Sequence, residues 1–292
     1  PGAGTPPPEL AGRDALRAGI AVSLERIRRG KAAKSVLMVG LRGVGKTVLL
    51  DRLAVDAEAA GLHTLRIEAP EDRSLPAILA PELRVALLRL SRIERVRELA
   101  VRALRGLAGF VEALQATFGD IQVGVDFAPE PGLADVGDLE HDLADLLVAA
   151  GEAAREAGTA LVLFVDELQY VGEAQLGAMI TALHRVAQRQ LPVVLVGAGL
   201  PQLRGQTGKA KSYAERLFEF PELTSLPPDA AREALAKPAE AEGVRYEPAA
   251  LDRILEATQG YPYFLQEWGK HVWDAASSSP ITLADVEAAS AV

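Results

Sequence analysis

Residues 40–47 read Gly40-Leu41-Arg42-Gly43-Val44-Gly45-Lys46-Thr47, which matches the pattern G-x-x-x-x-G-K-T without a mismatch. The apolar run at 35–39 predicts a buried strand before this stretch, and residues 48–54 predict a helix after it. A strand, a glycine-rich loop and a helix in this order aim several backbone N–H groups at one phosphate group. The stretch therefore predicts a phosphate-binding loop, with a chance glycine-rich turn as the alternative.

The side chains of this loop predict a nucleotide and a metal. Lys46 would reach the β- and γ-phosphates of ATP, and the Thr47 hydroxyl would ligate Mg²⁺. The residues expected to contact ATP or ADP here are Gly40, Gly43, Val44, Gly45, Lys46, Thr47 and Val48.

The composition limits the class of protein. The chain has 292 residues, 49% of them apolar, and is expected to form one large or two smaller globular domains. No apolar run reaches the roughly 18 residues of a membrane-spanning helix, so no membrane contact is expected. The absence of Cys excludes disulfides and thiolate metal sites, and we expect a cytoplasmic protein. The net charge of −9 argues against general polyanion binding.

Alternating strand and helix patterns predict the α/β class. Helical patterns at 48–60, 138–157 and 174–190 separate short apolar runs, and this alternation is typical of a doubly wound, largely parallel sheet. The runs that predict its strands are 36–39, 64–67, 161–165, 193–196 and, more weakly, 217–220.

The chain is expected to have three parts: a flexible Pro/Gly-rich lead at 1–9, an α/β core at 10–226, and a small all-helical domain at 227–292. Residues 71–135 are interpreted as an insertion for partner contact or regulation, with passive decoration as the alternative. Within it, helices are expected to break near Pro81 and at Gly106–Gly109. Residues 121–127 alternate like a strand.

Charge is unevenly distributed along the chain. Seven Arg residues lie between Arg84 and Arg105, and six acids without a Lys or Arg lie between Glu130 and Asp145. These segments either are solvated and pair with each other, or the Arg-rich one contacts nucleic acid or an acidic partner.

Two acids follow the apolar run at 161–165. Asp166 at the end of a buried strand beside a phosphate loop can hold Mg²⁺ through its water shell, and Glu167 can orient or deprotonate an attacking water. Gln169 is near in sequence and is given no role. The loop and the acid pair together predict an ATPase.

This combination resembles the additional-strand P-loop ATPases of the AAA+ and STAND groups, over roughly residues 10–290. In those families a strand lies between the loop strand and the acidic strand, and residues 64–67 are available for that place or its neighbour. Gly12-Arg13 looks like the short motif near the nucleotide base, with a surface turn as the alternative. Gly260-Tyr261-Pro262 looks like the STAND signature, although Pro262 could simply begin a helix.

The resemblance also implies candidates that act on the γ-phosphate. Arg216 is similar in place to an Arg finger that enters a neighbouring subunit's site, with an ion pair to Glu215 or Glu219 as the alternative and Arg204 as a weaker candidate. Pro262 stands where initiator-type AAA+ proteins commonly carry an Arg, which favours the STAND or archaeal-ATPase side, with origin-recognition-type initiators as close relatives.

The end of the fourth expected strand departs from the family pattern. Residues 197–199 are Gly-Ala-Gly where relatives usually place a polar residue that positions water, and Gln202 is the nearest polar substitute. This departure predicts slow hydrolysis. The aromatic residues of 261–273 are interpreted mainly as core of the helical domain or as a partner face.

We therefore expect a slow ATP-dependent switch that holds Mg-ATP between the core and the helical lid and drives conformational change or assembly. One alternative is a DNA-associated, initiator-like ATPase that contacts DNA through a region outside this chain. The other is a nucleotide-gated scaffold without turnover. A protein partner or self-assembly is expected in each case.

Overall fold

Five parallel strands form one sheet in the computed structural model, which describes Pro7 and residues 10–289. The strand order is β2-β3-β4-β1-β5, and every paired neighbour is parallel. This confirms the predicted α/β class. The strands are β1 (Ser35–Val39), β2 (His63–Glu68), β3 (Leu161–Asp166), β4 (Val193–Gly199) and β5 (Phe218–Glu219).

The sequence pattern of each strand follows from its place in the sheet. The central strands β1, β3 and β4 are buried along their whole length, which explains their continuous apolar runs. The edge strand β2 has exposed positions at Arg66 and Glu68.

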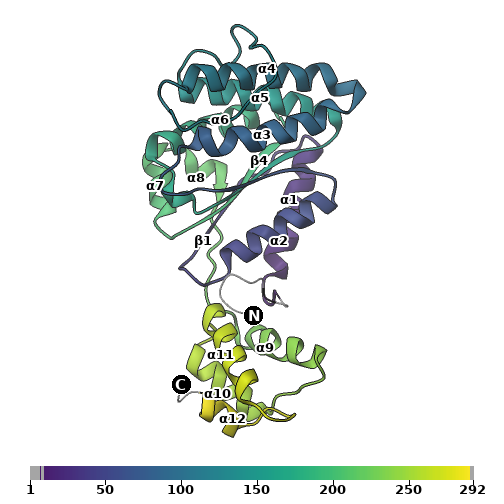
Figure 1. The fold of residues 1–292 in the computed structure, drawn as a ribbon, viewed down its shortest axis with the longest axis vertical. Helices are drawn as coiled ribbons and strands as arrows, with labels where there is room; N and C mark the ends of the chain where they lie inside the picture. The colour runs from purple at the N-terminus through teal and green to yellow at the C-terminus, as the bar shows by residue number, and fades with distance from the viewer. Residues whose placement is uncertain (1–6, 8–9, 290–292) are drawn as a thin grey trace. The chain divides into compact units, whose positions relative to one another are not determined.

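Helices follow the strands and cover the sheet (Figure 1). The α-helices of the described residues are, in chain order, α1 (Asp14–Arg28), α2 (Lys46–Ala59), α3 (Leu75–Ser91), α4 (Arg97–Leu114), α5 (Leu139–Ala157), α6 (Glu173–Gln188), α7 (Leu203–Ala210), α8 (Ala214–Leu217), α9 (Pro228–Ala241), α10 (Pro248–Thr258), α11 (Pro262–Ala275) and α12 (Leu283–Ala289). Short 3₁₀ turns occupy Glu94–Val96 and Leu168–Tyr170. Each of these helices is too short or too polar to cross a membrane.

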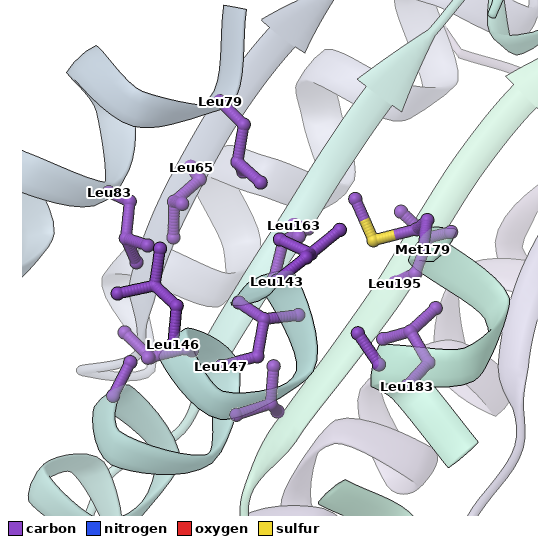
Figure 2. Packing of buried hydrophobic residues seen from close by; sticks show 14 of the residues in the cluster. Leu65, Leu79, Leu83, Leu143, Leu146, Leu147, Leu163, Met179, Leu183 and Leu195 are labelled. Carbon is purple, nitrogen blue, oxygen red and sulfur yellow. The ribbon is translucent and has the colours of Figure 1, made fainter. Parts of the chain in front are cut away.

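The main apolar core lies between the sheet and helices α3, α5 and α6 (Figure 2). Leu side chains of β2, β3 and β4 point toward Leu and Met side chains of these three helices, and all are almost fully buried. Helix α4 adds Leu104, Leu107 and Phe110 to the same core. Burial of each such side chain stabilises the fold by about 1.5–3 kcal/mol.

The predicted helix breaks in the segment 71–135 are wrong. Helix α3 runs through Pro81. A proline lacks the N–H that would bond the carbonyl of residue 77, but Arg73 Nη2 donates to the Ala77 oxygen at 2.9 Å and satisfies it.

Helix α4 likewise runs through Gly106 and Gly109. A Cβ at Gly106 would lie 2.9 Å from Leu133 Cδ2, and one at Gly109 would lie 3.1 Å from the Leu133 oxygen. The two glycines therefore serve close packing of the chain around Leu133 rather than helix termination.

The predicted strand at 121–127 is also wrong, because this segment has no strand partner among the described residues. Its alternation has another cause: Ile121 is buried, and Val123, Val125 and Phe127 pack against the main core from an extended segment. Alternating burial requires only an extended backbone over an apolar surface, and a sheet is one of several such surfaces.

The described chain divides into two compact units by its internal contacts. We call residues 19–39 and 50–221 the sheet unit. The helical unit comprises the described residues up to 18, residues 40–49, and the described residues from 222 onward. Apart from Pro7, the predicted flexible lead at 1–9 lies outside the described residues. The predicted domain borders at 10–226 and 227–292 remain predictions.

The helical unit has its own apolar core, built from α9 to α12. It contains Leu235, Ile254, Leu265 and Val272, with Trp268 packed against them. The expected role of the 261–273 aromatics as core fits Trp268. Tyr263, Phe264 and Trp273 are instead 42–49% exposed.

Candidate nucleotide site

The predicted phosphate loop begins directly after β1 and ends in the first turn of α2. Gly43 and Gly45 have φ angles of +81° and +88°, which residues with a side chain rarely adopt. A Cβ on Gly40 would lie only 2.4 Å from the Leu223 oxygen. The glycines of the motif are therefore required by the backbone path, and the path leads to the N–H groups of the α2 N-terminus, which lack partners within the helix.

Lys46 lies over the loop rather than in solvent, with only 6% of it exposed. Its Nζ donates to the Gly40 oxygen at 3.0 Å and to the Leu41 oxygen at 2.9 Å. These contacts offset the cost of burying an ammonium group. A phosphate would offer the same ammonium a charged acceptor, which makes a stronger hydrogen bond than a neutral carbonyl.

Helix α11 contacts this loop inside the helical unit. The Tyr263 N–H donates to the Gly43 oxygen at 3.1 Å, and the Tyr261 hydroxyl donates to the Arg42 oxygen. A Cβ on Gly43 would meet Tyr263 Cβ at 2.9 Å and Tyr261 Cε1 at 3.1 Å. Local sequence gave no signal for this contact, because it joins segments more than 200 residues apart.

A cavity of about 560 Å³ lies beside the loop in the helical unit. Val44, Gly45 and Val48 contribute to its lining, and the other lining residues come mainly from α9, α11 and the chain before α1, most of them apolar. Its volume and its apolar lining are typical of sites for small organic ligands. It is large enough for the base and sugar of a nucleotide whose phosphates lie on the loop.

The residues predicted near the base meet at this cavity. Arg13 and Pro262 both line it, and Pro262 is also the first residue of α11, so both interpretations of that proline fit. Gly12 lies in a turn with φ +71°, where a Cβ would lie 2.8 Å from Ala230 Cβ of α9. The turn at Gly12-Arg13 is therefore packed against α9.

Arg13 joins the loop to the chain that precedes α9. Its Nη2 donates to the Thr224 oxygen at 2.7 Å and to the Val44 oxygen at 3.4 Å. Burial lowers the pKa of Arg13 from its ordinary value, and the two carbonyls compensate part of that desolvation. Arg13 is therefore positioned to fix the loop at Val44.

The acid pair lies at the carboxyl end of β3 in the sheet unit. Asp166 is the last residue of β3 and is 7% exposed, and its Oδ1 accepts the Glu167 N–H at 2.8 Å. Glu167 has a left-handed φ of +53°, which costs a residue with a side chain about 1–2 kcal/mol. Strain of this kind is concentrated at functional sites.

Strand β4 takes the place between β1 and β3 in the sheet, and β2 lies on the other side of β3. Of the two places considered for residues 64–67, the structure therefore assigns the neighbouring one. Because parallel strands share one carboxyl edge, Asp166 and Glu167 lie on the edge toward which Val39 leads into the loop.

Gln169, which sequence reasoning gave no role, contacts Glu167. Its Nε2 donates to Glu167 Oε2, and its Oε1 accepts the Leu200 N–H at 3.0 Å. Gln169 is 8% exposed. The only signal in the sequence for this contact was that Gln169 lies two residues after Glu167.

The Arg candidates of the segment 204–216 are at the surface. Arg216 is exposed on α8, and no described residue, including Glu215 and Glu219, forms an ion pair with its side chain. The Arg204 guanidinium lies over the Phe220 ring, 5.7 Å from its centroid. Both Arg side chains are exposed, and Arg204 differs from Arg216 by its contact with an aromatic ring.

Part of the Arg-rich segment 84–105 is paired within the chain. Arg84 lies 3.3 Å from Asp126, and Arg102 donates to Glu130 at 2.9 Å. The hydrogen bond to Glu130 raises the pKa of Arg102. These pairs favour the interpretation of the segment as a solvated, internally paired face.

The residues that the structure describes contain no cluster of three His, Asp or Glu side chains able to hold a metal. Mg²⁺ usually keeps several waters and binds through one or two protein groups together with substrate phosphates. Thr47 is exposed in the first turn of α2, and its hydroxyl is of the type that such an ion uses. The residues present therefore fit Mg²⁺ delivered with a nucleotide.

A G-x-x-x-x-G-K-T loop after β1, an acid pair at the carboxyl end of β3 and a strand between β1 and β3 define a P-loop ATPase of the AAA+ type. Residues 9–196 match the model of the AAA ATPase domain. The chain belongs to the AAA ATPase domain family, whose members are nucleotide-binding proteins.

Solved structures support this fold. The chain is similar to RuvB, the Holliday junction branch migration motor of Thermotoga maritima, with 17% identity and a TM-score of 0.53 over 97% of this chain and 71% of that one. It is also similar to the ORC1 protein of Aeropyrum pernix, solved in complex with DNA, with 16% identity and a TM-score of 0.52 over 99% of this chain and 67% of that one. At these identities the likeness shows the fold alone. No curated protein matches the sequence.

Proposed function

We propose that this protein is a slow ATPase that works as a nucleotide-dependent switch. The observation that carries the proposal is the combination, within the helical unit, of a complete phosphate loop and an adjoining apolar cavity of about 560 Å³. The phosphates of ATP would bind the loop glycines, Lys46 and the α2 N-terminus, and the base would enter the cavity beside Arg13 and Pro262.

Mg²⁺ bound with the nucleotide would neutralise charge on the phosphates, with Thr47 as a direct ligand and Asp166 acting through water. Glu167 would orient and deprotonate the attacking water. The buried position of Asp166 and the strained backbone of Glu167 support these separate roles.

The contacts of α11 with the loop supply the switch. Tyr261 and Tyr263 bond the carbonyls of Arg42 and Gly43, so a change in the loop backbone reaches α11 directly. Loss of the γ-phosphate would alter the loop, and the helical unit would respond through these two bonds.

Slow turnover follows from the end of β4. Residues 197–199 carry no polar side chain, so this strand itself supplies no group to hold the attacking water. Arg216 would act on the ATP of a neighbouring copy, which makes self-assembly part of the proposal. The Gly260-Tyr261-Pro262 motif supports an assignment of the chain to the STAND side of the superfamily.

The test is steady-state phosphate release from ATP, measured against protein concentration, with Lys46→Ala as the blank. We expect Lys46-dependent release that Glu167→Gln abolishes while ATP binding is retained. Equal turnover in Glu167→Gln would contradict the assigned base. Assembly on ATP without phosphate release would instead identify a nucleotide-gated scaffold.

A further inference from the structure

The small residues at the end of β4 have a packing reason. A Cβ on Gly197 would lie 2.3 Å from Leu168 Cδ1, and one on Gly199 would lie 2.8 Å from Gln169 Oε1. A side chain at either position would displace the side chain of Leu168 or Gln169 in the 3₁₀ turn that follows the acid pair. The Gln169 amide thus occupies the space that a side chain at Gly199 would need.

The orientation of the Gln169 amide is determined by its partners. Its Oε1 accepts the backbone N–H of Leu200, and its Nε2 donates to the Glu167 carboxylate. If the amide oxygen and nitrogen were exchanged, the amide N–H would face the Leu200 N–H and the amide oxygen would face the Glu167 carboxylate. Both hydrogen bonds would then be lost. Gln169 therefore connects the end of β4 to one oxygen of Glu167, all within the sheet unit.

Gln202, the polar substitute expected from sequence, does not make such contacts. It is exposed at the N-terminus of α7 and makes no side-chain capping bond there. Gln206 of the same helix, by contrast, donates to the Gln169 backbone oxygen at 3.4 Å. The residue that bonds Glu167 is thus Gln169, and Gln206 connects Gln169 to α7.

We propose that Gln169 is the positioning residue for Glu167 and supplies the polar group that β4 lacks; this inference rests on the proposed hydrolysis. The amide holds one carboxylate oxygen and leaves the other to accept the proton of water. Because the Leu200 N–H holds the amide in turn, movement of α7 or the β4 end changes where the base points.

The experiment compares Gln169→Ala, Gln169→Glu and the matched control Gln202→Ala, with wild type and Lys46→Ala defining the Lys46-dependent rate. For Gln169→Ala we expect kcat to fall about 10- to 100-fold, because a misplaced catalytic group loses rate steeply, while KM and ATP binding stay unchanged. Gln202→Ala is expected to retain the wild-type kcat.

Gln169→Glu adds a readout that a packing role would not move. Glu keeps the size of the Gln side chain, so the packing is preserved, but a carboxylate has no N–H to donate to Glu167. The kcat of this variant should therefore fall as it does in Gln169→Ala, while ATP binding is retained.

Wild-type kcat in Gln169→Ala or in Gln169→Glu would overturn the inference while Lys46-dependent turnover still supports the proposed function. Loss of ATP binding in Gln169→Ala would assign a structural role and overturn it as well. Absence of Lys46-dependent turnover in wild type would overturn the proposed function, and the inference with it.

Discussion

Substitution of Gly43 by Ala tests the contact between the phosphate loop and α11. The φ of +81° costs an alanine about 1–2 kcal/mol relative to glycine. The added Cβ would lie 2.9 Å from Tyr263 Cβ and 3.1 Å from Tyr261 Cε1, and overpacking of this kind costs about 1–3 kcal/mol. Gly43→Ala should therefore lower the free energy of unfolding of the helical unit by about 2–5 kcal/mol.

Gly45→Ala is the matched control. Gly45 has a similar φ of +88°, but nothing lies within 4 Å of an added Cβ. Only the backbone cost of about 1–2 kcal/mol applies there. The difference between the two variants thus isolates the contact with Tyr261 and Tyr263.

Urea unfolding followed by tryptophan fluorescence measures this difference. The chain has two Trp residues, Trp268 and Trp273, and both lie on α11, so the signal reports the helical unit. We expect Gly43→Ala to lose about 1–3 kcal/mol more than Gly45→Ala. Unfolding free energies that agree within the extrapolation error of about 10–15% would refute the contact.

Three further predictions concern the sheet unit. Gly106→Ala should cost about 1–3 kcal/mol of stability because its Cβ would meet Leu133 Cδ2 at 2.9 Å, whereas Gly119→Ala, with nothing within 4 Å, should show no such clash; circular dichroism melts that rank them equally would refute the packing. Asp120 accepts the Ser74 N–H at 2.7 Å, and this bond lowers its pKa. The ionised Asp120 therefore stabilises the folded state at pH values above the pKa of the unfolded chain, so Asp120→Ala should be less stable than wild type at neutral pH. The difference in unfolding free energy should close as pH falls through the lowered pKa of Asp120. A difference that persists in urea unfolding at acid pH would contradict this prediction. Arg216→Ala should remove any rise of specific turnover with protein concentration, and Arg204→Ala should keep that rise. An unchanged dependence on concentration in Arg216→Ala would refute the role of Arg216 as an Arg finger.

Elements with local causes could be predicted from the sequence. Three of the five predicted strands are buried on both faces, so continuous runs of Val, Leu, Met and Phe mark them. The phosphate loop and the Asp166-Glu167 pair are contiguous motifs whose chemistry depends on neighbouring residues. Each could be recognised without knowledge of the rest of the chain.

The errors and omissions have tertiary causes. Pro81 stays inside α3 because Arg73 satisfies the freed carbonyl, and Gly106 stays inside α4 because Leu133 needs the space. The contact of Gln169 with Leu200 likewise joins residues that are distant in sequence. Local pattern carries no information on such partners.

The most direct test of the central claim is calorimetric titration of ATP with Mg²⁺ into wild type and Lys46→Ala. Lys209→Ala removes the same charge from an exposed position on α7 and serves as the control. The account predicts saturable binding by wild type and Lys209→Ala and none by Lys46→Ala. Equal binding by Lys46→Ala, or no binding by wild type, would contradict a nucleotide site on the loop at 40–47.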